Sequence, residues 1–374
     1  MKKILITLTA LLMLVGCSST KGDEYTKYDA RSSEVGFDTV ITYVAYAKSE
    51  AEFNSQFDVV KTSFLHYNEL FDKYHDYEGV NNIKTINDQA GIAPVKVDPL
   101  IIEMIKRAKE YTDISDGYFD ISYGAVLEIW HDYREEGIDL NGEGKPGRIP
   151  EMSVLEEAAQ FVGWQFVEVD EANSTVYLNN TRAKLDVGAI AKGYATELVA
   201  LELEAMGVEH AIVSGGGNVR SIGTKPDGTP WAIGVEKPSM IVKNESLDIF
   251  SIPHSMSIVT SGDYQRYYTG PDDKVYSHLV NPHTLMPEAR FQSVTIFTPD
   301  STMADALSTA LYMMTYEEGL AYVNDFNTKF PDRKIDVMWV TSQTNQPDWY
   351  KTDDYAYMFT DNLKQYSKML TSKL

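Results

Sequence analysis

The stretch AKGYATELVALELEAMGVEHAIVSGGGN, residues 191–218, places a helix, a sharp stop and a strand in direct succession. Its apolar residues follow the helical period as far as Met206. Gly207 predicts the end of the helix, because glycine readily adopts the left-handed conformation that follows many helices. Residues 210–213 then have the composition of a buried strand and lead into three consecutive glycines. We expect an amphipathic helix followed by a sheet strand.

Strands occur in runs on both sides of this stretch instead of alternating with helices. Runs rich in β-branched and aromatic residues predict strands at residues 40–46, 232–235, 249–252, 257–259, 294–297 and 337–340, and a hairpin at 167–178. Helical periodicity predicts helices from Phe53 to about Tyr74, at 100–111 and at 303–314, and a capping box at Ser153 and Glu156 predicts a short helix ending near Gly163. Residues 137–150, rich in glycine and charge, predict an exposed loop. The pattern is typical of an α+β fold with a mainly antiparallel sheet and packed helices.

The N-terminus has the pattern of an export signal. A basic start is followed by an apolar run at residues 4–15, which is too short to span a bilayer. Cys17, the only cysteine, follows Leu-Val-Gly and resembles a bacterial lipobox, in which the cysteine is lipidated. We expect residues 1–16 to be a lipoprotein signal peptide, 17–35 a polar tether and 36–374 the folded domain, anchored on the extracytoplasmic face of the cell membrane. An ordinary signal peptide that contains a cysteine is the alternative.

Composition excludes several classes of function. The formal charge of −22, from 33 basic and 55 acidic residues, disfavours nucleic acid as a partner, because its phosphates would be repelled. A single cysteine excludes internal disulfides and cysteine-rich metal sites. Arg220 stands where a dinucleotide fingerprint needs its third glycine, and Gly193 follows Lys192 where a P-loop needs Ser or Thr. Neither the zinc-protease helix motif nor the hydrolase nucleophile elbow is present in the sequence.

Four other segments carry groups that could perform chemistry. Asp186 and Lys192 flank small residues at a predicted strand-to-helix junction, where they could bind a phosphate or form a surface ion pair. The glycines at 215–217 could hold an anion through their amides or simply form a turn. His278 could be a general base or only a hydrogen-bonded histidine. Asp305 and Thr309 share one helical face and could supply oxygen ligands to Mg²⁺, although a helix cap is the alternative.

Taken in this order and spacing, the segments resemble the ApbE family of FAD:protein FMN transferases over residues 36–345. The matching motifs are DGYFD (116–120), DVGAIAKGY (186–194), GGGN (215–218), TSGDY (260–264), HLVNPHT (278–284) and ADALST (304–309). The resemblance implies an ApbE-like architecture related to the T-fold. It further implies transfer of FMN from FAD to a Thr or Ser hydroxyl of an extracytoplasmic acceptor protein, with release of AMP.

The resemblance also implies roles for individual residues. FAD is expected to contact Phe37, Tyr74, Tyr118, Phe119, Asp120, Asp186, Lys192 and Leu279. Mg²⁺ is expected to bind Asp305, Thr309, the backbone carbonyl of Ala189 and Ser308. His278 is the candidate base that deprotonates the acceptor hydroxyl, and Asp186 is the second candidate. The alternatives are an FAD diphosphatase that uses water as nucleophile, and a lipid-anchored flavin-binding protein without turnover.

Three positions depart from the family pattern. Phe37-Asp38-Thr39 replaces an early Met-Gly-Thr, Leu285 stands where glycine usually follows, and Tyr118 replaces the commoner alanine. The chain lacks the acceptor-like motif Asp-Gly-x-Ser/Thr-Gly-Ala-Thr, so we expect it to modify another protein and not itself.

Overall fold

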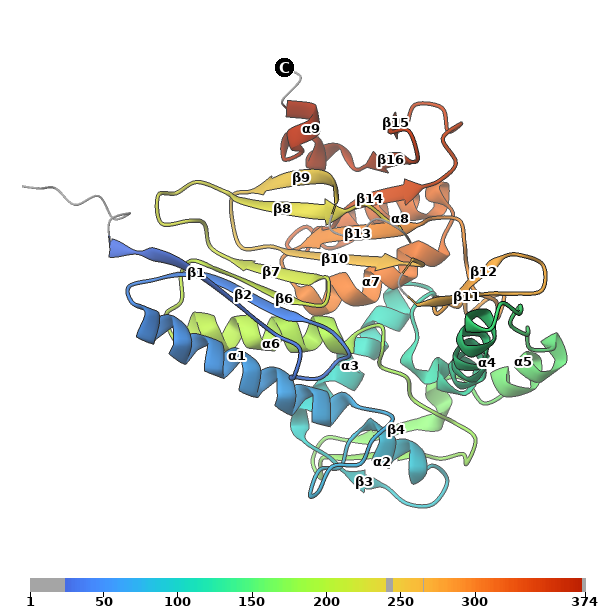
Figure 1. The fold of residues 1–374 in the computed structure, drawn as a ribbon. Coiled ribbons are helices and arrows are strands. Elements are labelled where there is room, and N and C mark those ends of the chain that lie inside the picture. The colour runs from blue at the N-terminus through green and yellow to red at the C-terminus, as the bar shows by residue number, and fades with distance from the viewer. Residues whose placement is uncertain (1–23, 240–244, 265, 372–374) are drawn as a thin grey trace, which may run out of the picture.

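A nine-stranded sheet forms the centre of the computed structural model, which describes residues 24–239, 245–264 and 266–371 (Figure 1). Its spatial order is β1 (Thr26–Ser32), β2 (Ile41–Ala47), β6 (Ala211–Gly215), β7 (Asn218–Ile222), β10 (Ser257–Gly262), β13 (Ser293–Thr298), β14 (Asp336–Thr341), β16 (Ala356–Phe359) and β15 (Tyr350–Lys351). All its neighbouring strands pair antiparallel. The expected α+β fold with a mainly antiparallel sheet is confirmed.

Helices cover one face of this sheet and enclose the main core. The helices of the described residues are α1 (Glu50–Phe71), α2 (Ile83–Asp88), α3 (Pro99–Ile114), α4 (Gly124–Gly142), α5 (Met152–Ala159), α6 (Ala191–Ala205), α7 (Ser301–Met313), α8 (Tyr316–Lys329) and α9 (Lys368–Thr371). The face of the sheet that carries Tyr43, Val259 and Trp339 packs against α1, α6 and α7 in one continuous apolar core. This packing fixes α6 and α7 against each other.

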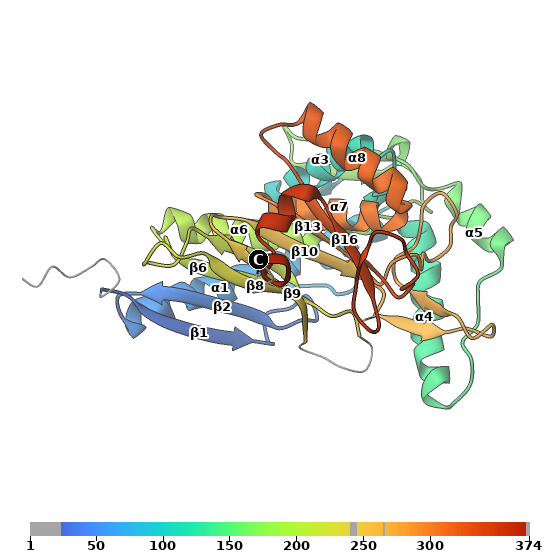
Figure 2. The same ribbon diagram turned by 90° about the horizontal axis from the view of Figure 1, so that it is seen from above.

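Smaller sheets complete the molecule. They are the hairpin β8 (Trp231–Glu236) and β9 (Ser246–Ile252), the three-stranded sheet β3 (Val95–Lys96), β5 (Thr175–Leu178) and β4 (Val167–Asp170), and the hairpin β11 (Tyr267–Thr269) and β12 (Val275–Ser277). The β8–β9 hairpin packs through Trp231 and Phe250 on the side of the large sheet opposite α6 and α7 (Figure 2). The β11–β12 hairpin packs against α4 at one end of the molecule, and α4 in turn contacts α5 (Figure 1).

The structure corrects three expectations. The tether expected at 17–35 is partly a strand, because β1 pairs with β2 along its whole length. The sequence of β1 is polar because an edge strand buries little surface. The loop expected at 137–150 is helical as far as Gly142, and Gly137 is buried where the Tyr268 ring packs against its Cα. The capping box at Ser153 and Glu156 does not form, since the N-cap of α5 is Glu151 without a side-chain cap bond. The expected hairpin at 167–178 is confirmed as β4 and β5.

Candidate active site

One cavity of about 830 Å³ lies where α4, α6 and α7 meet the loops around them. It brings together nearly every residue expected at the site: Phe37, Tyr74, Tyr118, Phe119, Asp120, Asp186, Ala189, Lys192, His278, Leu279, Asp305 and Thr309. Ser308 does not line it; its hydroxyl donates to the Asp305 carbonyl at 2.9 Å and lies 2.8 Å from the Ser261 hydroxyl. Cys17 lies outside the described residues. The fold therefore collects segments more than 250 positions apart in the chain around one cavity.

Asp186 is an ionised carboxylate paired with a lysine that the sequence did not single out. The Lys73 ammonium lies 2.5 Å from Asp186 Oδ2, and the second oxygen accepts from the Gly188 amide at 2.9 Å. Burial alone would raise the pKa of Asp186, but the charge of Lys73 outweighs it and holds that pKa below its usual value. A carboxylate held in this way is a poor proton acceptor. The surface ion pair between Asp186 and Lys192 that the sequence left open is not found.

Asp305 owes its position to a close contact between α6 and α7. A Cβ on Gly193 would lie 2.4 Å from the Asp305 Cβ and 2.4 Å from the Ser301 carbonyl, so only glycine fits there. The Gly193 amide donates to Asp305 Oδ2 at 2.7 Å. Asp305 is therefore an interior residue of α7, not its cap; Asp300 is the N-cap and accepts from the Thr302 and Met303 amides.

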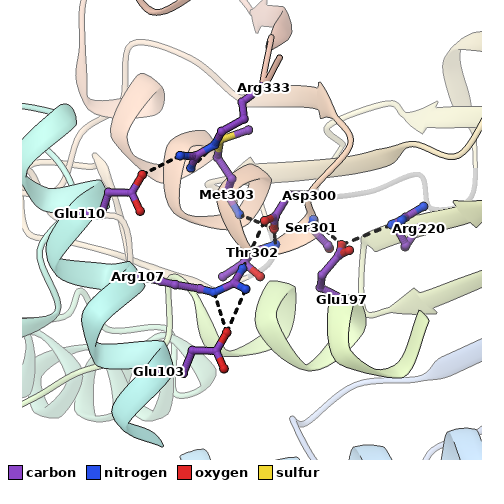
Figure 3. A network of polar contacts seen from close by, with 10 residues as sticks. All are labelled: Glu103, Arg107, Glu110, Glu197, Arg220, Asp300, Ser301, Thr302, Met303 and Arg333. Carbon is purple, nitrogen blue, oxygen red and sulfur yellow. Dashed lines mark hydrogen bonds and ion pairs between the residues drawn. The ribbon is translucent and has the colours of Figure 1, made fainter. Parts of the chain in front are cut away.

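A polar network fixes the start of α7 (Figure 3). Glu197 on α6 accepts from the Ser301 amide at 2.7 Å and from the Arg220 guanidinium on β7 at 3.2 Å. Arg107 on α3 bonds to Asp300 at 3.2 Å. Because these contacts tie α7 to α3, α6 and β7, they set where Asp305 sits along the wall of the cavity.

The residues around Asp305 fit a hard cation with oxygen ligands. Burial raises the pKa of Asp305, although Lys192 lies close enough to oppose the rise, and no salt bridge to Asp305 occurs among the described residues. Asn218 also lies close, but its buried Nδ2 has no hydrogen bond of normal geometry. A buried carboxylate beside the Thr309 hydroxyl is the donor set that Mg²⁺ prefers. No cluster of three His, Cys, Asp or Glu side chains is found in the described ranges.

His278 presents a neutral imidazole to the cavity. Its Nδ1 lies 3.3 Å from the Arg266 carbonyl, which requires the hydrogen on Nδ1 and leaves the Nε2 lone pair available. Burial, together with the charges of Arg134, Arg266 and Lys192, lowers the pKa of His278 to about 3. An anionic ligand beside the same cations would offset part of that effect and make the imidazole more basic.

Aromatic and strained residues lie in and near the rest of the cavity. Lys73 lies over the Tyr74 ring, with its Nζ 4.8 Å from the ring centroid. The Tyr118 ring packs edge-on against the His283 ring, with the two ring centroids 4.4 Å apart. Asp38 and Leu285 have φ of 49° and 63°, at positions where the family pattern has glycine. The turn geometry of the glycine is therefore kept by residues that adopt it at some energetic cost.

Comparison with known proteins places the chain in a family. The sequence profile of the ApbE family matches residues 37–331. This chain belongs to the ApbE family. An FAD:protein FMN transferase of Vibrio cholerae is 26% identical over 322 residues, covering 86% of this chain and 90% of the relative. One from Treponema pallidum is 30% identical over 272 residues, covering 68% and 72%. The crystal structure of the ApbE protein of Thermotoga maritima superposes with a TM-score of 0.73 at 28% identity, over 92% of this chain and all of that one.

Several lining residues of this ApbE-family cavity were missed by reasoning from the sequence. Lys73 falls at the end of the helix predicted from Phe53 to about Tyr74, without any motif around it, and its partner lies 113 positions away. His131 and Arg134 lie on α4, a helix that the sequence analysis did not predict. Ser261 was noted only as part of the motif at 260–264. A helical reading of residues 124–136 would have shown that His131 and Arg134 share one face.

Proposed function

We propose that this chain transfers the FMN part of FAD to a Thr or Ser hydroxyl of an acceptor protein and releases AMP. The observation that carries the proposal is the convergence of Asp186, Lys192, His278 and Asp305 on one cavity. The relatives that are FAD:protein FMN transferases span most of the chain, which supports the same activity.

In the proposed reaction the acceptor oxygen attacks the FMN phosphorus of FAD. The new O–P bond forms as the bond from that phosphorus to the bridging oxygen breaks, and AMP leaves with the bridging oxygen. His278 accepts the hydroxyl proton at Nε2 and can return it to the AMP phosphate. Lys192 places a positive charge beside His278 and Asp305, where it offsets charge on the diphosphate.

Asp305, Thr309 and the Ala189 carbonyl would hold Mg²⁺ at one wall of the cavity. When bound, the ion supplies neutralisation of the diphosphate charge. Asp186 has a different part: as a carboxylate fixed by Lys73 it can orient a donor group of the flavin or ribityl chain, and His278 remains the better candidate base.

We further propose that the protein is exported and anchored by a lipid on Cys17, on the extracytoplasmic face of the membrane. The basic start, the short apolar run and the lipobox-like residues before Cys17 support this. Within the described residues no helix is long and apolar enough to cross a membrane. Mass spectrometry of the mature N-terminus tests the anchor: a diacylglyceryl or palmitoyl group on Cys17 supports it, and a free terminus or cleavage well downstream contradicts it.

The activity is tested by incubating purified protein with FAD and Mg²⁺, with and without an acceptor domain that carries the motif Asp-Gly-x-Ser/Thr-Gly-Ala-Thr. Flavin fluorescence that stays on the denatured acceptor, with AMP formed in equal amount, supports transfer. Free FMN and AMP without labelling would instead show hydrolysis. Intact FAD would show binding alone.

A further inference from the structure

Helix α4 adds to the cavity a largely buried arginine that no motif identifies. Arg134 lines the cavity, and its side chain is 13% exposed. Its Nη2 donates to His131 Nδ1 at 2.7 Å, and reaches Glu135 Oε1 only at 3.4 Å. The Glu135 side chain is 59% exposed, so water screens that contact.

The guanidinium keeps unused hydrogen-bonding capacity. The Nε–H and both Nη1–H donors of Arg134 have no acceptor within the described parts of the chain. His131 accepts through Nδ1 and is neutral, because burial and the charges of Arg134 and Lys73 lower its pKa. The hydrogen bond to His131 therefore orients the guanidinium without neutralising it. A cation that is largely removed from water normally pairs with an anion.

The location of Arg134 shows which anion it can meet. Arg134 and His278 line the same cavity, and the charges of Arg134, Arg266 and Lys192 all act to lower the pKa of His278. Arg134 therefore lies beside the imidazole that we assign as the base. Lys73 also lines the cavity, but its charge is already neutralised by the Asp186 carboxylate at 2.5 Å.

We propose that Arg134, oriented by His131, binds a phosphate group of the dinucleotide substrate next to His278. This inference rests on the proposed function, because FAD is the ligand that would bring a diphosphate into the cavity. An arginine guanidinium suits a phosphate group, because its planar fork of donors can form two parallel hydrogen bonds to a pair of phosphate oxygens. The same contact would hold the AMP phosphate after transfer.

Binding experiments with the full-length protein distinguish recognition of the phosphate groups from recognition of the flavin ring. The variants are Arg134→Ala, Arg134→Lys, and Arg148→Ala as a matched control. Arg148 also pairs with a glutamate of α4, Glu136, but is 66% exposed and does not line the cavity. Quenching of intrinsic fluorescence gives the affinities for FAD, AMP and riboflavin, and thermal melting confirms that each variant is folded.

We expect Arg134→Ala to weaken FAD and AMP binding by roughly 10- to 100-fold, the effect of losing a charged hydrogen bond, and to leave riboflavin binding unchanged. Arg134→Lys should recover part of the loss, because it keeps the charge without the fork. Arg148→Ala should match the wild type. Equal losses for FAD and riboflavin, or no loss for either nucleotide in a folded Arg134→Ala or Arg134→Lys variant, would overturn the inference.

The two proposals fail in different ways. If the wild type binds FAD and Arg134→Ala weakens FAD and AMP binding but not riboflavin binding, while no acceptor is labelled, the phosphate contact is supported and the proposed transfer activity is wrong. If transfer occurs and Arg134→Ala binds FAD and AMP normally, only the phosphate contact is wrong. If the wild type binds no FAD, both are wrong.

Discussion

Replacing Gly193 by alanine should damage the site through a single methyl group. The added Cβ would lie 2.4 Å from the Asp305 Cβ and 2.4 Å from the Ser301 carbonyl oxygen. Carbon atoms in contact normally stand about 3.5–4.0 Å apart, so α6 and α7 must separate by roughly 1 Å at this point. Overpacking of this kind costs about 1–3 kcal/mol of unfolding free energy.

The same displacement should affect turnover more than stability. It would lengthen the 2.7 Å hydrogen bond from the Gly193 amide to Asp305 and move that carboxylate relative to Lys192. A misplacement of about 1 Å at reacting groups can cost roughly 100-fold in rate. We therefore expect Gly193→Ala to lower the unfolding free energy by about 1–3 kcal/mol and the transfer rate by about 100-fold, with more Mg²⁺ needed for half-maximal rate.

Gly142→Ala is the control, because a Cβ at this residue of α4 would meet nothing within 4 Å. It should match or slightly exceed wild-type stability, since alanine is the better helix former, and keep full activity. Denaturant unfolding and a magnesium titration of the transfer rate measure both variants. Wild-type stability and rate in Gly193→Ala would refute the proposed close contact and its part in placing Asp305.

Three further predictions concern single side chains. Asp305→Ala should abolish magnesium-dependent transfer while the melting temperature stays near that of the wild type, because it removes the carboxylate that we propose binds Mg²⁺; full transfer with Mg²⁺ would contradict this. His278→Ala should keep FAD affinity and lose roughly 10²- to 10⁴-fold in transfer, with partial recovery as pH rises; a loss that tracks unfolding would instead mark a structural histidine. Burial raises the pKa of Asp263 to about 7, so the folded state favours its protonated form and stability should fall as pH rises from about 4 to 7. Asp263→Asn should remove that fall, at most roughly 4 kcal/mol, when unfolding is compared at pH 4 and pH 8, and an unchanged pH dependence would refute the assignment.

The sequence predicted the interior of the molecule better than its edges. Buried strands such as β10 and β14 show as apolar runs, and Gly207 marks the end of α6, because local chemistry decides these features. The strand β1 was missed, since an edge strand buries little and reads as linker. The glycine at 137 was taken for a loop signal, although its role is to admit the Tyr268 ring against a helix.

In the candidate site, too, residues within local motifs could be predicted, whereas residues that depend on distant partners could not. Residues inside local motifs, such as Lys192 and Asp305, line the cavity, because the motif carries both the turn and the functional group. Lys73 and Arg134 could not be predicted, since each depends on a partner or neighbour brought close only by the tertiary fold. Ser308 lies within a motif but does not line the cavity, because its hydroxyl forms hydrogen bonds with the Asp305 carbonyl and the Ser261 side chain.

The central claim is most directly tested by intact-mass analysis of an acceptor domain after incubation with this protein, FAD and Mg²⁺. The account predicts that the acceptor gains the mass of one FMN less water, on its motif Thr or Ser, and that one AMP appears for each flavin attached. It also predicts that Asp305→Ala gives neither product. An unmodified acceptor alongside FMN and AMP in solution, or labelling that persists in Asp305→Ala, would contradict it.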